Sequence, residues 1–133
     1  LGTTIAVFSL FHIIQVQQIH GDWQTAGQKV QKFFVSIDEL YSDSWSRNDL
    51  RFHFVNVPIR TGEAWIFPVG LSDALWFAFQ NDNLEVYIHS ALPEAVSPAG
   101  TSLQDRVFKF NDDGSIEEVI RFKDGFPINV LSQ

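Results

Sequence analysis

The side chains best suited to acid–base or metal chemistry are four histidines, and their spacing limits what they could do together. His12 and His20 are eight residues apart, which on a helix is about 12 Å and too far for one metal ion to bind both. His53 and His89 fall on separate predicted strands, so only the fold could bring them together. A general-base hypothesis pairs His53 with a carboxylate such as Asp73. The simpler interpretation, ordinary histidines on a helix and on strands, predicts no catalytic residue and no metal site.

Other patterns in the chain fall short of a catalytic site. The segment 70–73, Gly-Leu-Ser-Asp, lacks the second glycine and the strand-to-helix context of a nucleophile elbow. The segment 111–114, Asn-Asp-Asp-Gly, is rich in oxygen ligands but lacks the spacing of an EF-hand, and a tight turn explains it better. With no cysteine, disulfides and thiol chemistry are excluded. We therefore predict no cofactor, and the sequence favours a protein without catalytic activity.

Aromatic residues are abundant, with 13 Phe and 4 Trp. Trp65, Trp76 and the phenylalanines around them could line a pocket for an apolar ligand. Equally, aromatic side chains at alternating strand positions are what a sheet uses to bury a helix. Core packing is the favoured interpretation, with a ligand pocket as the alternative.

The charge balance argues against nucleic acid as a partner. The chain of 133 residues has the length of one domain and a formal net charge of −7. Its nine basic residues are scattered, whereas binding to a phosphate backbone requires clustered Lys and Arg. We expect no direct binding to nucleic acid and little attraction to anionic lipid headgroups.

The strongest periodic signal predicts one long helix from about Thr3 to Tyr41. Its apolar residues alternate in steps of three and four and form one stripe: Val16, Ile19, Trp23, Ala26, Val30, Phe33, Ile37 and Leu40. The phase continues through Gly21 and Gly27, each of which weakens a helix by about 1 kcal/mol without ending it. The alternative is two helices that break at Gly21, with Asp22 as the N-cap of the second.

The two halves of this helix differ in polarity. Residues 1–21 contain no charged residue, and residues 5–16 are apolar nearly all round, interrupted only by Ser9, His12 and Gln15. Residues 22–41 are amphipathic. A helix that is apolar on every side must be buried on every side, by a membrane, by the chain's own core or by neighbouring copies. A membrane span needs about 20 apolar residues, and the dense apolar stretch here is nearer a dozen. The side chains expected to make this contact are Ile5, Val7, Phe8, Leu10, Phe11, Ile13, Ile14 and Val16.

Residues 42–133 are predicted to form an antiparallel sheet within the same domain. Residues 42–49 form a polar connection and residues 90–102 a loop rich in Pro, Ala and Ser. The expected strands are 50–54, 65–67, 75–79 and 84–88, a hairpin of 106–110 with 116–122 that turns through 111–114, and a last strand near 128–131 after Asp124-Gly125. The predicted fold is therefore α+β, with a long amphipathic N-terminal helix packed on an antiparallel β-sheet.

This arrangement resembles type IV pilins and pseudopilins, and most closely the minor pseudopilins of Gram-positive competence systems. The resemblance is carried by the apolar spine Ile5–Ile19, the polar switch Gln17–Trp23 and the C-terminal segment Val119–Gly125. Ile5 stands where that family usually has Glu. The resemblance implies a membrane-anchored or filament-forming subunit without catalysis, found at the cell surface or outside the cytoplasm, with other pilin-like subunits or a membrane complex as partners. The chain begins at Leu1 without Met, so we expect either a removed leader or a longer product.

Two other functions fit the same pattern. A helix cradled by a curved sheet also resembles the cone-shaped fold of nuclear transport factor 2 and ketosteroid isomerase relatives. That resemblance implies a soluble domain that binds a small apolar ligand or acts as an isomerase or cyclase, with His53, Asp73 and the surroundings of Trp76 as its site. A membrane-tethered accessory subunit of a larger complex is the third possibility.

Overall fold

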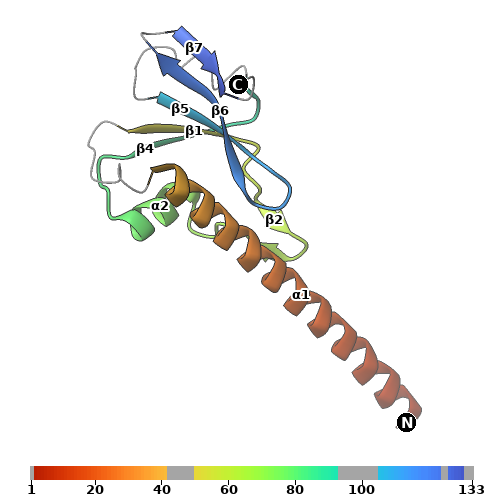
Figure 1. Cartoon of the computed structure of the whole chain (residues 1–133). Helices are drawn as coiled ribbons and strands as arrows, with labels where there is room; N and C mark the ends of the chain where they lie inside the picture. The colour runs from red at the N-terminus through yellow and green to blue at the C-terminus, as the bar shows by residue number, and fades with distance from the viewer. Residues whose placement is uncertain (1, 42–49, 93–104, 124–125, 131–133) are drawn as a thin grey trace.

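The computed structural model describes residues 2–41, 50–92, 105–123 and 126–130. These form an α+β fold with a mixed five-stranded sheet, a small two-stranded sheet and two helices (Figure 1). In chain order the elements are α1 (Gly2–Tyr41), β1 (Arg51–Val55), β2 (Arg60–Thr61), β3 (Ala64–Trp65), α2 (Leu71–Phe79), β4 (Glu85–His89), β5 (Asp105–Phe110), β6 (Ile116–Lys123) and β7 (Phe126–Asn129).

The first element is one uninterrupted helix, as the periodicity predicted. α1 has 40 residues, which corresponds to a length of about 60 Å. It does not break at Gly21, so the two-helix alternative is wrong. Its C-terminal half lies along the sheet and buries Ala26, Phe33 and Ile37. Its N-terminal half extends past every other element (Figure 1).

The main sheet is mixed, so the prediction of a purely antiparallel sheet is wrong. The strand order is β4-β1-β5-β6-β7. The central strand β1 pairs in parallel with both β4 and β5, which places His53 beside Tyr87 and Val107. The remaining pairs, β5 with β6 and β6 with β7, are antiparallel. Parallel pairing requires a crossover connection between β1 and β4.

The crossover contains a helix where a strand was predicted. Residues 75–79 were expected to form a central strand, but they belong to α2. The continuous apolar run misled the prediction because a short buried helix and a short buried strand look alike in sequence. Asp73 in the first helical turn was the local signal for a helix. The expected strand 65–67 is also shorter, since β3 ends at Trp65.

An aromatic core lies between α1, α2 and one face of the sheet. Phe33 is fully buried, and its ring stacks on Phe110 at a centroid distance of 5.2 Å. It also meets Phe54 and Phe67 edge to face, at 5.9 and 5.3 Å. The same cluster includes Leu71 and Leu75 from α2. Because α1 and α2 share this core, they cover the same face of the sheet.

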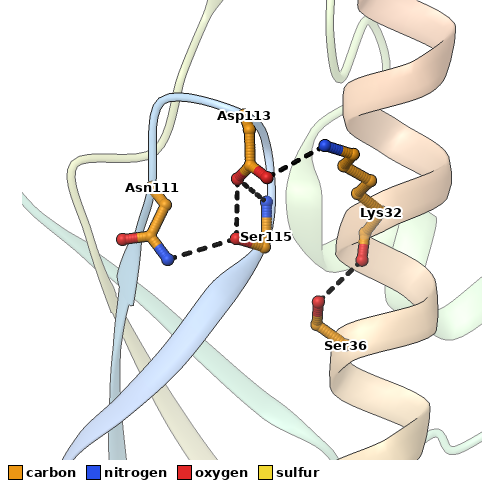
Figure 2. Close-up of polar contacts among 5 residues, drawn as sticks. All are labelled: Lys32, Ser36, Asn111, Asp113 and Ser115. Carbon is orange, nitrogen blue, oxygen red and sulfur yellow. Dashed lines mark hydrogen bonds and ion pairs between the residues drawn. The ribbon is translucent and has the colours of Figure 1, made fainter.

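The predicted hairpin of β5 and β6 is confirmed, and its turn is packed on α1 (Figure 2). The Lys32 ammonium is paired with the Asp113 carboxylate at 2.9 Å. Asp113 also accepts hydrogen bonds from the backbone N–H and the hydroxyl of Ser115. The Ser115 hydroxyl and then Lys32 lower the pKa of Asp113 well below its usual range. Gly114 has a φ of 93° and lies directly against the backbone of Lys29, so the turn fixes the position of the helix.

Several predicted features lie outside the described residues. These are the connection 42–49, most of the loop 90–102, the Asp124-Gly125 turn and the end of the last strand at Leu131. The described part of that strand is β7.

Candidate functional site

The N-terminal half of α1 presents a continuous apolar surface to solvent. All residues from Thr4 to Gly21 are exposed. Ile5, Phe8, Phe11 and Ile14 are exposed by 61, 65, 57 and 54%. The other predicted contact residues, Val7, Leu10, Ile13 and Val16, are equally uncovered. The chain's own sheet therefore leaves this surface free, and we call residues 4–20 the helix end.

The helix end owes its conformation to the anchored half of α1. Isolated helices of this length are marginal in water, and this one has no acidic residue in its first turn to offset the helix dipole. Packing begins at Asp22, whose carboxylate accepts a hydrogen bond from the backbone N–H of Glu63 at 3.0 Å. Ala26 then packs in a small cluster with Ala64 and Ile66. From that point the helix is held, and the helix end continues it into solvent.

The amino-acid composition of the helix end falls short of that of a membrane-spanning helix. Within the described residues, neither helix combines the length and the hydropathy needed to cross a bilayer.

A second arrangement of chemical interest lies on the sheet face opposite the aromatic core. Side chains alternate along β1, so Phe52 and Phe54 face the helices and His53 faces the other way. His53 Nδ1 lies 3.0 Å from His89 Nε2. His53 Nε2 lies 3.6 Å from an oxygen of the buried Asp105 carboxylate. The parallel pairing of β1 with β4 and β5 thus assembles an Asp–His–His row.

The electrostatics of this row keep His53 neutral. A hydrogen bond between two imidazoles needs one donor and one acceptor, so two protonated rings cannot form it. Burial lowers the pKa of His53, and the nearby Asp105 carboxylate opposes that shift without cancelling it. Arg51 Nε lies 3.2 Å from Asp105 and compensates part of its charge. The two imidazoles share one hydrogen bond, whereas the 3.6 Å between His53 and Asp105 is too long for one, so the row is not a complete active site.

This arrangement predicts a loss of stability in mild acid. Because the pKa of His53 is lower in the folded chain than in the unfolded chain, the unfolded state binds the proton more readily. The stability is complete above the ordinary pKa of about 6.5 and falls as the pH drops below it, by at most about 1.4 kcal/mol per pH unit for one proton. Urea denaturation at pH 7.5 and 5.5 measures the difference. In His53→Gln the difference should shrink, and an unchanged difference in that variant would contradict the role of His53.

The other predicted site residues do not converge. Asp73 lies in α2 and His53 on the sheet face away from α2, so the carboxylate beside His53 is Asp105. Trp76 borders an open apolar hollow of about 510 Å³, formed between α1 and α2. Trp65 is elsewhere, with the Arg60 guanidinium stacked on its ring at 4.6 Å. No observation therefore favours an enclosed ligand pocket lined by both tryptophans.

Asp105 was missed as a partner of His53, and whether His89 lies beside His53 was left to the fold. The signal that could have placed them is strand register, because parallel pairing aligns residues 53 and 87 and residues 51 and 105. An antiparallel sheet would not align them in this way. In the described part of the chain, no group of three or more His, Cys, Asp or Glu side chains could hold a metal ion.

No protein-family model matches the chain, and no curated protein or solved structure is found to be similar to it.

Proposed function

We propose that this protein is a pilin-like assembly subunit, attached to its partners through the helix end. The observation that supports the proposal is a rigid helix whose first half exposes apolar side chains on all sides. Large apolar patches on a soluble domain mark sites of interaction with proteins or membranes. The rest of the fold holds this helix in one orientation, as a subunit that joins others must.

The driving force is burial of the apolar side chains. Covering one Val, Leu, Ile or Phe side chain contributes about 1.5–3 kcal/mol relative to leaving it in water. The helix end carries nine such side chains, the eight named above and Ile19, so even partial cover offsets the entropy lost on association. Because the backbone is already helical, binding does not require a coil to fold, although the side chains at the contact still lose rotamer freedom.

The polar residues of the helix end favour protein partners over lipid. Ser9, His12 and Gln15 interrupt the apolar surface on successive turns. Such side chains can form hydrogen bonds between packed helices, whereas lipid tails would leave them without partners. Residues 2–21 also have no Lys or Arg to attract anionic headgroups.

The resemblance to minor pseudopilins extends the proposal to the cellular role. By that resemblance the chain would be held at a membrane before assembly, act at the cell surface or outside the cytoplasm, and join other pilin-like subunits, as in competence systems. It would neither catalyse a reaction nor bind nucleic acid directly.

Sedimentation velocity tests the proposal. We expect the wild-type chain to form concentration-dependent oligomers, or to co-sediment with neutral lipid vesicles. The double substitution Phe8→Ser/Phe11→Ser should abolish both behaviours, because it removes two of the largest exposed apolar side chains. Neither side chain packs on the sheet, so the circular dichroism spectrum should keep its helix and strand bands.

The matched control is Gln17→Ser/Gln18→Ser, which makes two exposed substitutions on the same helix without removing apolar surface. It should assemble like the wild type. The proposal would be contradicted by a wild-type chain that remains monomeric at every concentration and does not co-sediment with vesicles.

A further inference from the structure

A second exposed apolar surface lies at the opposite end of α1, where α2 packs beside it. It is formed by Phe34, Val69, Asp73, Ala74, Trp76 and Phe77, and we call it the α1/α2 groove. Phe77 and Val69 are exposed by 76 and 68%. Phe34 also borders a second hollow with Val35 and Phe79, so the apolar surface continues along α1.

The groove exists because α2 is apolar on both sides. Leu71 and Leu75 point to the sheet and are buried in the aromatic core. Trp76 and Phe77 follow them in sequence and face solvent. A helix that is apolar all round is expected to be buried all round, yet one side of α2 is uncovered by the chain.

The helix end of the same molecule cannot reach this groove. Phe34 belongs to α1 itself, and α1 runs without a break from Gly2 to Tyr41. The helix end therefore points away from α2, as Figure 1 shows. Any helix that occupies the groove must come from another molecule.

We propose that the α1/α2 groove receives the helix end of a second copy of this chain. The inference rests on the proposed function and names the surface that the helix end contacts. An amphipathic or apolar helix in a hydrophobic groove is a common mode of recognition. The groove is apolar apart from Asp73, with Asp38 next to it. Residues 2–21 contain no Asp or Glu, so the helix end brings no negative charge toward these two carboxylates, and the ring N–H groups of His12 and His20 can donate hydrogen bonds to them.

This contact joins the helix end of one copy to the α1/α2 groove of another, so the two copies use different surfaces. Such a head-to-tail contact forms either a closed ring or an open filament, depending on whether the rotation between copies closes. The groove lies on the C-terminal half of α1 and the helix end is its N-terminal half, on a helix of about 60 Å. A copy whose helix end fills a groove therefore presents its own empty groove at a distance from that contact, and a further copy can be added there.

Disulfide cross-linking tests the contact directly, because the chain has no native cysteine. One set of variants carries a single cysteine on successive turns of the helix end: Thr4→Cys, Phe8→Cys, Phe11→Cys and Gln15→Cys. Each is mixed with Phe77→Cys and oxidised. We expect a disulfide dimer between the two variants for at least one position. Tyr87→Cys replaces Phe77→Cys in the control, since Tyr87 is an exposed aromatic residue on β4 that does not border the groove.

The outcomes separate this inference from the proposed function. Dimers that form only between two helix-end cysteines would show that helix ends pack on one another, so the proposed function would stand and the groove would be ruled out. Equal cross-linking to Phe77→Cys and Tyr87→Cys would also contradict the proposal that the helix end binds in the groove. A cysteine-free check is Phe77→Asp, which should weaken self-association at least tenfold in sedimentation, whereas Tyr87→Asp should leave it unchanged.

Discussion

Replacing Glu118 with alanine is expected to lower the free energy of unfolding by about 3 kcal/mol, because it removes a buried carboxylate from a cationic network. Glu118 lies on β6 and is buried. Its oxygen lies 3.3 Å from Arg106 Nε and 3.1 Å from Arg121 Nε. It also accepts a hydrogen bond of 3.3 Å from the Tyr41 hydroxyl at the last residue of α1. Urea denaturation with a two-state fit provides the measurement.

The large effect follows from what the substitution leaves behind. Arg106 is mostly buried, so its charge would lose a nearby counter-charge in a region of low dielectric. Burial first, and then the Glu118 charge, raise the pKa of Tyr41 above its ordinary value. The phenol is therefore a neutral donor to this carboxylate at physiological pH. Without Glu118, the Tyr41 hydroxyl at the end of α1 loses its hydrogen bond to the sheet, and Arg106 loses its ion pair.

Glu117→Ala is the matched control on the adjacent position of β6. Its carboxylate lies 3.9 Å from the Lys109 ammonium, and both side chains are partly exposed. Ion pairs of this kind contribute about 0–1 kcal/mol. A loss in Glu118→Ala no larger than that in Glu117→Ala would show that the network adds nothing to stability.

The long helix and the last hairpin could be predicted because their signals are local and redundant. The stripe from Val16 to Leu40 keeps one phase over many turns, and that agreement outweighed two glycines. The turn at residues 111–114 carries a glycine where a positive φ is required, and Gly114 adopts it. In both cases neighbouring residues alone determine the element.

The mixed sheet could not be predicted in the same way because strand pairing depends on residues far apart in sequence. The direction of β4 relative to β1 follows from the segment between them, and that segment contains α2. With residues 75–79 taken as a strand, the predicted connection between β1 and β4 was a series of antiparallel strands, whereas the structure has a crossover through α2. One local error of this kind changes the orientation of every later strand. The pairing of His53 with His89 depends on that orientation, so the sequence left it open.

The exposed helix end was predictable for a different reason. A stretch without charge that is apolar on all sides cannot lie on one sheet, whatever the strand order. The prediction needed only the change of polarity near Asp22, and packing on the sheet begins at that residue. The α1/α2 groove, by contrast, depends on α2 and was not foreseen.

Two turns from the sheets fix the direction in which the helix end points. The first is the β2–β3 turn, where the Glu63 N–H is hydrogen-bonded to Asp22. The second is the β5–β6 turn, which is paired with Lys32 through Asp113 (Figure 2). The two contacts lie on the same helix, ten residues apart by number, about 15 Å along its axis. These two contacts act together with the aromatic core, in which Phe33 and Ile37 of α1 are buried, to define the orientation of the helix.

Gly114→Ala is expected to lower the free energy of unfolding by about 3 kcal/mol. A non-glycine residue at a φ of 93° is strained, at a cost of about 1–2 kcal/mol. The added methyl group would also lie 2.5 Å from the Cα of Lys29 and 2.6 Å from its carbonyl oxygen. Overpacking of this kind costs about 1–3 kcal/mol. Both neighbours are backbone atoms of a helix, so relief requires the turn to move away from α1. Urea denaturation measures the loss.

Gly27→Ala adds the same methyl group to the same helix and should have the opposite sign. No atom lies within 4 Å of the position that its Cβ would occupy, and alanine favours a helix interior over glycine by about 1 kcal/mol. Comparing Gly114→Ala with Gly27→Ala therefore distinguishes the loss of the contact between the turn and α1 from a general effect of replacing glycine. If Gly114→Ala were neutral while Gly27→Ala stabilised the chain, the hairpin turn would not be packed on α1, and the direction of the helix end would depend on the β2–β3 turn and the aromatic core alone.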